Sequence, residues 1–227
     1  MFKIFFRITR FREYFSKVRF NHYSKRIRNY KITKNILESE YSKNAFSKYN
    51  SIPARIDYLC RIIRLLEPKK NTKLLSIGPR FESELFGYMG LGISRKNISA
   101  VDTYSYSPLI QVGDAHDLKF VDNSFDIVVI GWTLAYSKNP GLFISEAVRV
   151  CSKMGFIVLT YDLQSNIEMY IKKAVAAKYP VIPLVNKQNY ILKNFKNFTV
   201  KRFTLENVFW KGAIKPTPIG LLVLEKL

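Results

Sequence analysis

The chain opens with apolar residues spaced for a helix. A stripe recurs every three or four positions through residues 2–20, which predicts one helical face formed by Ile4, Ile8, Phe11, Phe15 and Val18. Residues 51–67 repeat this spacing, with Ser51 as the expected N-cap and Pro53 in the first turn. Residues 21–50 between them are polar, basic and weakly periodic. We therefore expect a basic, aromatic-rich helical extension over residues 1–50 and a globular domain over residues 51–227.

From residue 73 onward, short apolar runs alternate with helical patterns. Strands are predicted at 73–77, 98–102, 109–112, 125–130 and 156–161, helices at 82–90, 140–151 and 165–178, and a turn at 153–155. Two later runs, 198–205 and 219–225, suit an antiparallel pair. This order predicts an α/β, Rossmann-like, doubly wound sheet of seven mostly parallel strands with an antiparallel C-terminal pair.

Composition excludes several classes of protein. The 227 residues are 48% hydrophobic, enough for a packed core. No apolar run is long enough to span a membrane and no secretory signal is evident, so we expect a cytoplasmic protein. Cys60 and Cys151 lie in apolar helical patterns and are expected to be reduced thiols. No His/Cys cluster has metal-ligand spacing, so no metal is expected.

The net charge of +20 is concentrated in the first third of the chain. A positive region attracts phosphates of nucleic acid or of lipid headgroups, although A+T-rich codons also explain many of the lysines. The aromatic and basic residues 1–35 leave three destinations open. We favour docking on the chain's own core or on a partner subunit over an anionic membrane surface, which would make the protein peripheral, and over a targeting role.

Five segments reach the carboxyl ends of the predicted strands, where doubly wound sheets bind ligands. They are Gly78-Pro79-Arg80, Asp102-Thr103, Asp114-Ala115-His116, Gly131-Trp132-Thr133 and Asp162. A carboxylate such as Asp102 at the end of the second strand can accept two hydrogen bonds from a ribose diol. The Gly-x-Gly-x-x-Gly fingerprint of nicotinamide dehydrogenases is absent, so that class ranks low.

Residues 113–162, "GDAHDLKFVDNSFDIVVIGWTLAYSKNPGLFISEAVRVCSKMGFIVLTYD", carry a more specific pattern. An acid-Ala pair precedes an L-x-F-x-D-N-S-F-D run, a buried strand, a helix ending in E-x-x-R-V and a glycine turn. With the first strand-helix-strand unit, this pattern resembles the class I S-adenosylmethionine-dependent methyltransferases, closest to the methyltransferase 11-like type. The resemblance covers about residues 70–162.

The resemblance implies S-adenosylmethionine as cofactor. Gly78 would approach its methionine part, Asp102 its ribose hydroxyls, and Asp114 with Ala115 its adenine. Trp132 would either border the cofactor or belong to the core. The implied cofactor-binding set is Gly78, Pro79, Arg80, Asp102, Thr103, Asp114, Ala115 and Trp132. His116 is expected to be an ordinary loop residue.

The first turn departs from the family pattern of an acid followed by Gly-x-Gly-x-Gly. Ser76 stands near the acid position, and Gly78 is followed by Pro79, Arg80 and Phe81. Arg80 could pair with the cofactor's carboxylate, because a guanidinium fork suits that group. Alternatively, Arg80 or Phe81 fills the cleft, and the chain is a non-catalytic methyltransferase-like scaffold that binds a protein partner. We favour retained binding because the acids for ribose and adenine remain.

The expected reaction is methyl transfer to a small-molecule, glycan-precursor or lipid-linked acceptor. Positioning supplies most of the acceleration when the methyl group is already activated, so the catalytic residue stays unassigned. Tyr136 and Asp162 are weak candidates, and residues 209–211 are expected to wall the acceptor. Gly131-Trp132-Thr133-Leu134 stands where an Asn-Pro-Pro-Tyr-like tetrad would indicate methylation of nucleic-acid bases, so nucleic acid is disfavoured.

Overall fold

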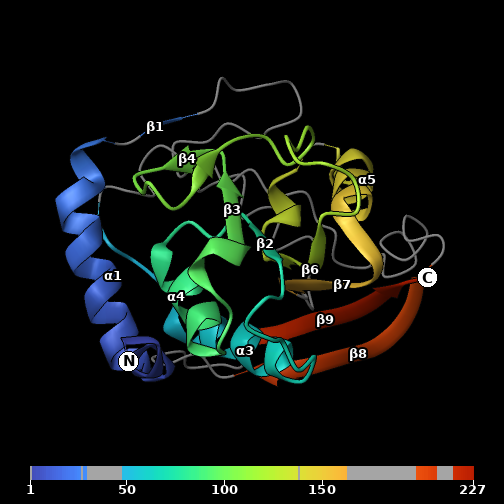
Figure 1. Ribbon diagram of the computed structural model, residues 1–227, viewed down its shortest axis with the longest axis horizontal. Helices are drawn as coiled ribbons and strands as arrows, with labels where there is room; N and C mark the ends of the chain where they lie inside the picture. Colours follow the sequence, from blue (N-terminus) through green and yellow to red (C-terminus); the bar gives the residue numbers. More distant parts are fainter. Residues whose placement is uncertain (1, 27, 30–47, 138, 163–197, 209–216) are drawn as a thin grey trace.

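The computed structural model describes residues 2–26, 28–29, 48–137, 139–162, 198–208 and 217–227. The predicted helix at 165–178 and the acceptor wall at 209–211 lie outside this part. A seven-stranded sheet forms the centre, with the order β5-β3-β2-β6-β7-β9-β8 (Figure 1). Its strands are β2 (Leu74–Ile77), β3 (Ile98–Asp102), β5 (Gln111–Val112), β6 (Phe125–Gly131), β7 (Cys151–Asp162), β8 (Phe198–Val208) and β9 (Thr217–Lys226).

The predicted fold class is confirmed. The strands β5, β3, β2, β6 and β7 run parallel, whereas β9 pairs antiparallel with both β7 and β8. The chain builds outward from β2 through β3 to β5 and then returns to place β6 on the other side of β2. This reversal makes the carboxyl ends of β2 and β6 the switch point at which such sheets bind ligands.

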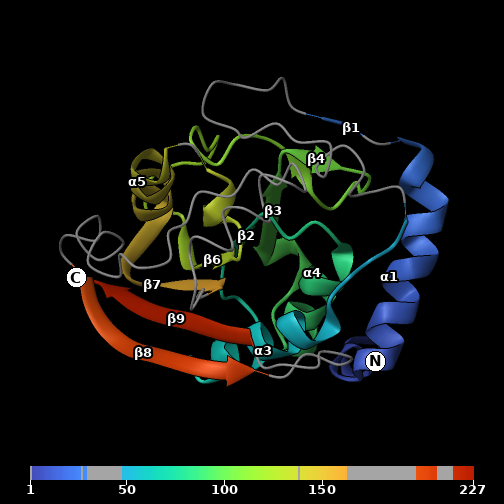
Figure 2. The same ribbon diagram turned by 180° about the vertical axis from the view of Figure 1, so that it is seen from behind.

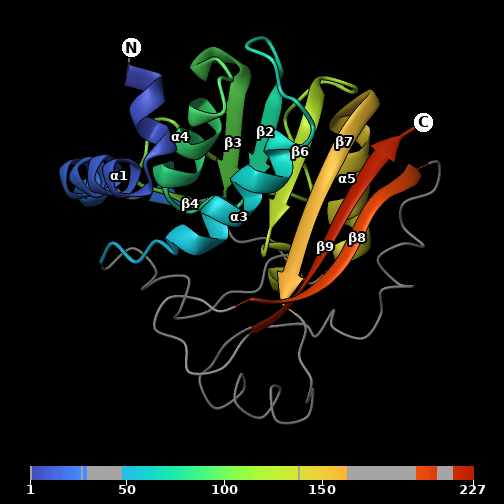
Figure 3. The same cartoon turned by 90° about the horizontal axis from the view of Figure 1, so that it is seen from below.

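Helices cover both faces of the sheet, and the alternation of side chains along β6 shows how. Ile127 and Val129 pack in one cluster with α3 (Pro53–Arg64) and α4 (Glu82–Gly90). Val128 and Ile130 pack in a second cluster with α5 (Pro140–Val150) on the opposite face. The run from Ile127 to Ile130 is therefore apolar at every position, because both faces of this part of the central strand are buried. Figure 3 shows the strands side by side, with α3 and α5 on opposite sides.

Two local predictions are wrong. The N-cap of α3 is Ile52, and the hydroxyl of Ser51 instead lies 3.1 Å from that of Ser83 on α4. The turn predicted at 153–155 is part of the long strand β7, where Met154 adopts a positive φ of 60°. The register between β6 and β7 shifts at this point, so a bulge accommodates the extra residues without ending the strand.

Several shorter elements complete the described structure. They are the 3-10 turns η1 (Phe2–Arg7), η2 (Ser24–Arg26), η3 (Arg95–Asn97) and η4 (Leu134–Tyr136), with a small antiparallel pair of β1 (Arg28–Asn29) and β4 (Tyr104–Ser105). Cys60 and Cys151 are free thiols, and burial raises the pKa of each to about 12. No helix in the described ranges is long and apolar enough to cross a membrane.

The N-terminal helix α1 (Thr9–Tyr23) docks on the chain's own domain beside α4 (Figures 1 and 2). The stripe predicted for it is wrong in part, because Ile8 and Val18 are exposed while Arg12 is buried. The period of the pattern breaks at the change from η1 to α1. Apolar spacing alone also places every arginine outside, whereas here Asp57 of α3 neutralises Arg12 at 2.8 Å.

Aromatic stacking and a second ion pair complete the docking of α1. The ring of Phe6 stacks on Phe86 of α4 at a centroid distance of 4.8 Å, and Phe15 meets the same ring at 5.2 Å. Arg19 pairs with the fully buried Glu82 at the start of α4. The helix α4, which follows the turn after β2, is thus packed against α1 on its outer side.

Candidate functional site

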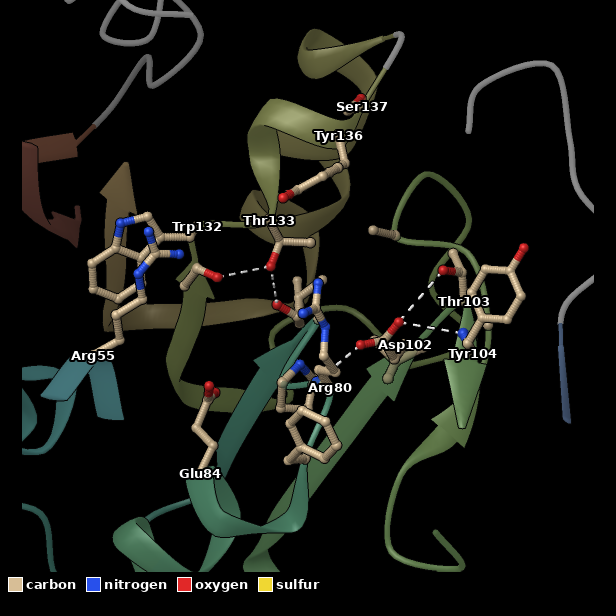
Figure 4. A pocket seen from close by; sticks show the side chains of 18 of the residues that line it. Arg55, Arg80, Glu84, Asp102, Thr103, Tyr104, Trp132, Thr133, Tyr136 and Ser137 are labelled. Atoms are coloured by element: carbon tan, nitrogen blue, oxygen red, sulfur yellow. Dashed lines mark hydrogen bonds between the residues drawn. The ribbon is translucent and has the colours of Figure 1, made fainter. Parts of the chain in front are cut away.

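A cavity of about 230 Å³ lies at the carboxyl ends of β2, β3 and β6. All the residues of the predicted cofactor-binding set line it: Gly78, Pro79, Arg80, Asp102, Thr103, Asp114, Ala115 and Trp132. The structure brings them together because parallel strands present their carboxyl ends at one edge of the sheet. Figure 4 shows Arg80 between two groups, with Glu84, Arg55 and Trp132 on one side and Asp102, Thr103 and Tyr104 on the other.

The turn after β2 is tight and needs its glycine. Gly78 adopts a φ of +76°, and an added Cβ would overlap the side chain of Thr133. Its N–H donates to the carbonyl of Val101 at 2.8 Å, which holds the turn against β3. Arg80 follows with a φ of +53°, a strained value for a side-chain-bearing residue. Gly78 is therefore required by the close packing of Thr133 and by its positive φ, and it also lines the cavity.

Asp102 fixes this turn from the neighbouring strand. Its Oδ2 accepts the N–H of Arg80 at 3.0 Å, and its Oδ1 accepts the N–H of Tyr104 at 3.3 Å and the hydroxyl of Thr103 at 3.4 Å. Burial raises the pKa of Asp102, and the hydrogen bonds from Tyr104 and Arg80 oppose that shift. The carboxylate and the turn hold each other in place.

Asp114 belongs to a buried chain of polar groups. Its Oδ1 accepts the N–H of His116 at 2.9 Å and lies 2.5 Å from Nδ1 of the same ring. Nε2 of His116 lies 2.6 Å from the hydroxyl of Ser137, which follows η4. All three residues are buried. His116 is therefore no ordinary loop residue, because it ties the loop after β5 to the segment after β6.

Trp132 serves both the cavity and the core. It is 9% exposed, packs in the cluster with α3 and α4, and also lines the cavity. It adopts a φ of +55°, and its N–H donates to the carbonyl of Thr160 at 3.0 Å. The guanidinium carbon of Arg55 lies 4.7 Å from the centroid of its ring. Trp132 therefore belongs to the core, and because it also lines the cavity, its place beside a bound cofactor stays a prediction.

Sequence reasoning missed Glu84 and Arg55, which reach the cavity from helices rather than from strand ends. Glu84 is 8% exposed, and its Oε1 accepts hydrogen bonds from the hydroxyls of Ser76 and of Tyr88, the latter at 2.8 Å. Burial raises the pKa of Glu84. A signal was present, since Glu84 falls at helical spacing on the apolar face shared by Phe81, Leu85 and Tyr88.

Of the weaker candidates, Tyr136 lines the cavity, whereas the side chain of Asp162 lies outside the description. Phe81 packs with Phe20 and Tyr106 at centroid distances of 5.7 and 6.1 Å. In the part of the chain that the structure describes, no group of three or more His, Cys, Asp or Glu side chains could hold a metal ion.

The strand order and the cavity at the switch point define a Rossmann-like methyltransferase fold. The sequence of residues 80–159 matches the family model Methyltransf_11, described as a methyltransferase domain. Residues 80–159 therefore match a methyltransferase domain, which confirms the resemblance noted in the sequence. The match begins at Arg80, so it leaves Ser76, Gly78 and Pro79 of the departing turn uncovered. No curated protein matches the sequence significantly.

Solved structures of similar fold agree with this class. The MccD protein superposes with a TM-score of 0.58 at 18% identity, covering 78% of this chain and 100% of that one. A possible histamine N-methyltransferase from Thermotoga maritima gives 0.54 at 15%, covering 83% and 95%. An S-adenosylmethionine-dependent methyltransferase from Methanosarcina mazei gives 0.52 at 16%, covering 73% and 97%. At these identities the likeness concerns the fold.

Proposed function

We propose that this protein binds S-adenosylmethionine in the cavity at the switch point and transfers its methyl group to a small-molecule acceptor. One observation carries the proposal: the predicted residues of the cofactor-binding set, drawn from separate segments of the chain, line a single cavity. The carboxyl ends of parallel strands meet at one edge of any such sheet, so the support lies in the residue types found there, which are those that the resemblance assigns to the cofactor.

The residues present fit the cofactor. Gly78 lines the cavity at the end of β2 and carries no side chain, which suits the approach of the methionine part. Asp102 lies at the tip of β3, where a carboxylate can hold the ribose hydroxyls. Asp114 and Ala115 line the same side for adenine, and His116 orients the carboxylate of Asp114. The bound cofactor would supply a methyl group already activated by its sulfonium.

The position of the Arg80 side chain determines whether the cavity has room for the cofactor. The cavity is smaller than the roughly 300–1,000 Å³ typical of small-molecule sites, and Figure 4 shows Arg80 in its middle. Binding therefore requires the Arg80 side chain to move toward the edge of the cleft, where it can pair with the cofactor's carboxylate. The scaffold hypothesis needs Arg80 or Phe81 to block the cleft. Phe81 lines the cavity, and its ring also packs against Phe20 of α1 and Tyr106 after β4.

The acceptor is expected to be a small molecule that enters beside Tyr136 and Trp132. These aromatic side chains can shape the acceptor's position, and proximity is the main requirement for an in-line transfer from an activated methyl group. Within the class of small acceptors, a glycan precursor or a lipid-linked molecule is the more specific proposal. The rings of Phe6 in η1 and Phe15 in α1 pack against Phe86 of α4, so these two side chains are engaged by the chain's own domain.

Calorimetric titration with S-adenosylmethionine and S-adenosylhomocysteine tests the proposal. We expect micromolar binding, and Asp102→Ala should weaken it about tenfold to a hundredfold because charged hydrogen bonds to the ribose are lost. Asp117→Ala removes an exposed carboxylate paired with Lys119 and serves as the matched control. Absence of heat and of a thermal shift at millimolar ligand in the wild type would contradict the proposal.

A further inference from the structure

The carboxylate of Glu84 is buried, and the protein donates hydrogen bonds to only one of its two oxygens. Both hydroxyl donors, from Ser76 and Tyr88, bind its Oε1. Its Oε2 lies 3.9 Å from the point where a Cβ on Gly131 would stand, at the wall of the cavity. Figure 4 shows the carboxylate pointing from α4 into the cleft. Among the described residues, no donor binds Oε2 and no cation pairs with Glu84.

Such a group is costly in a folded protein. A buried carboxylate is tolerated when a cation or several hydrogen bonds compensate it, and two hydroxyls on one oxygen give only part of that compensation. Burial raises the pKa of Glu84, and the negative charge of Asp102 raises it further. A ligand with a positive group beside Oε2 would supply the missing partner.

Glu84 places a carboxylate close to the position where the family pattern has an acid and this chain has Ser76. Ser76 stands near the place where the family pattern has an acid, and its hydroxyl donates to Glu84. The negative charge is therefore retained at the end of β2, one hydrogen bond away, but it comes from α4. Glu84 and Arg55 lie on the same side of the cleft, opposite Asp102 (Figure 4).

We propose that Glu84 binds the α-ammonium group of the cofactor's methionine part and so replaces the missing strand acid. This inference rests on the proposed function and adds the residue that recognises the amino-acid end. It also gives the cleft a direction, with the amino-acid end at Glu84 and the ribose at Asp102. Ser76 and Tyr88 then act as positioning residues, because they aim the carboxylate without contacting the ligand.

The test compares two ligands that differ at this end alone. S-Adenosylhomocysteine has adenine, ribose, thioether and the amino-acid group, whereas 5′-methylthioadenosine has the first three without the amino acid. Glu84→Gln keeps the shape and the acceptor oxygen but removes the charge. We expect it to weaken S-adenosylhomocysteine at least about tenfold, as for removal of one partner of a buried charge pair, and to leave 5′-methylthioadenosine unchanged.

Controls separate the failure of this inference from that of the proposed function. Glu67→Gln changes an exposed glutamate and should affect neither ligand. If the wild type binds neither ligand, the proposed function fails. If the wild type binds S-adenosylhomocysteine and Glu84→Gln binds it equally well, or if the variant loses both ligands alike, the role of Glu84 is refuted while cofactor binding stands. Circular dichroism of each variant confirms that it is folded.

Discussion

The two ends of the cleft hold their carboxylates by different means. At the Asp102 end, both oxygens of the acid accept hydrogen bonds, two of them from backbone N–H groups of adjacent loops. At the Glu84 end, the acid comes from a helix, and two side-chain hydroxyls bind the same oxygen. The Asp102 end is therefore fixed by local backbone, whereas the Glu84 end depends on how α4 packs against β2.

This contrast suggests a division of work within the proposed site. An acid with both oxygens engaged by the protein serves the fold as well as the ligand, so its replacement disturbs the turn that it holds. An acid with one oxygen unbonded and facing the cavity is available to a ligand, so its replacement should affect binding more than folding. Three predictions test the comparison, from the largest expected effect to the smallest.

The turn between the two ends should be the most sensitive position. Gly78→Ala places a Cβ against Thr133 and also strains a φ of +76°. We expect a loss of about 2–4 kcal/mol in the free energy of unfolding and loss of binding of both ligands. Gly92→Ala is the matched control, because Gly92 has a φ of +103° with nothing within 4 Å of the added Cβ.

Gly92→Ala should therefore show only the backbone term, about 1 kcal/mol. Urea titration gives both free energies, and calorimetry gives the binding. Equal destabilisation by the two substitutions would mean that Thr133 yields easily, and the tight turn would then have no special role in shaping the cavity.

Arg80→Ala tests which end of the cleft its side chain serves. If Arg80 pairs with the cofactor's carboxylate, the variant should bind S-adenosylhomocysteine about tenfold more weakly and 5′-methylthioadenosine as before. Arg80→Lys should restore part of the affinity, since it keeps the charge without the planar fork. Tighter binding of both ligands by Arg80→Ala would instead show that the guanidinium blocks the cleft.

The smallest effect concerns stability and pH at Glu84. Because its pKa is raised above the ordinary value of 4.5 in the folded state, the folded protein binds a proton that the unfolded chain has already lost. The contribution of Glu84 to stability is thus complete below that ordinary value and is lost as the pH rises through the raised pKa. Glu84→Gln should therefore be more stable than the wild type at pH 7, by about 1 kcal/mol.

The advantage of the same variant should be smaller at pH 4, below the ordinary value of 4.5, because there the unfolded chain also binds most of the proton. Thermal unfolding at the two pH values measures the difference, with Glu67→Gln again as the control. An advantage that does not change with pH would show that the gain comes from packing or hydrogen bonding instead of charge. Together with the binding test, the expected result would show that Glu84 costs stability in return for ligand recognition.

The part of the site nearest the strand ends could be predicted from the sequence. Buried parallel strands are short apolar runs, and the residue that follows each run must lie at the same edge of the sheet. Gly78, Asp102, Asp114 and Trp132 were found in this way, and all of them line the cavity. The sheet followed from the same alternation, and the family resemblance of residues 113–162 agreed with it.

The polar partners could not be predicted, because local spacing does not reveal what a polar group meets. His116 is bonded to Ser137, which is 21 positions away on another segment. Arg12 is charged, yet it is buried because Asp57 of α3 lies beside it. In each case the burial of a polar side chain is affordable only with a partner that another element brings, and the sequence does not name that partner.

What the sequence by itself determined is the order of strands and helices, the edge of the sheet at which ligands bind and the methyltransferase-like character of that edge. The first two features rest on the period of apolar residues, which is a local property of the sequence. The third rests on the family resemblance of residues 113–162. What only the tertiary structure decided is the pairing of Ser76 with Glu84, the chain from Asp114 to Ser137 and the docking of α1 on α4. They depend on contacts between distant segments, whose free energies arise only once the core has packed.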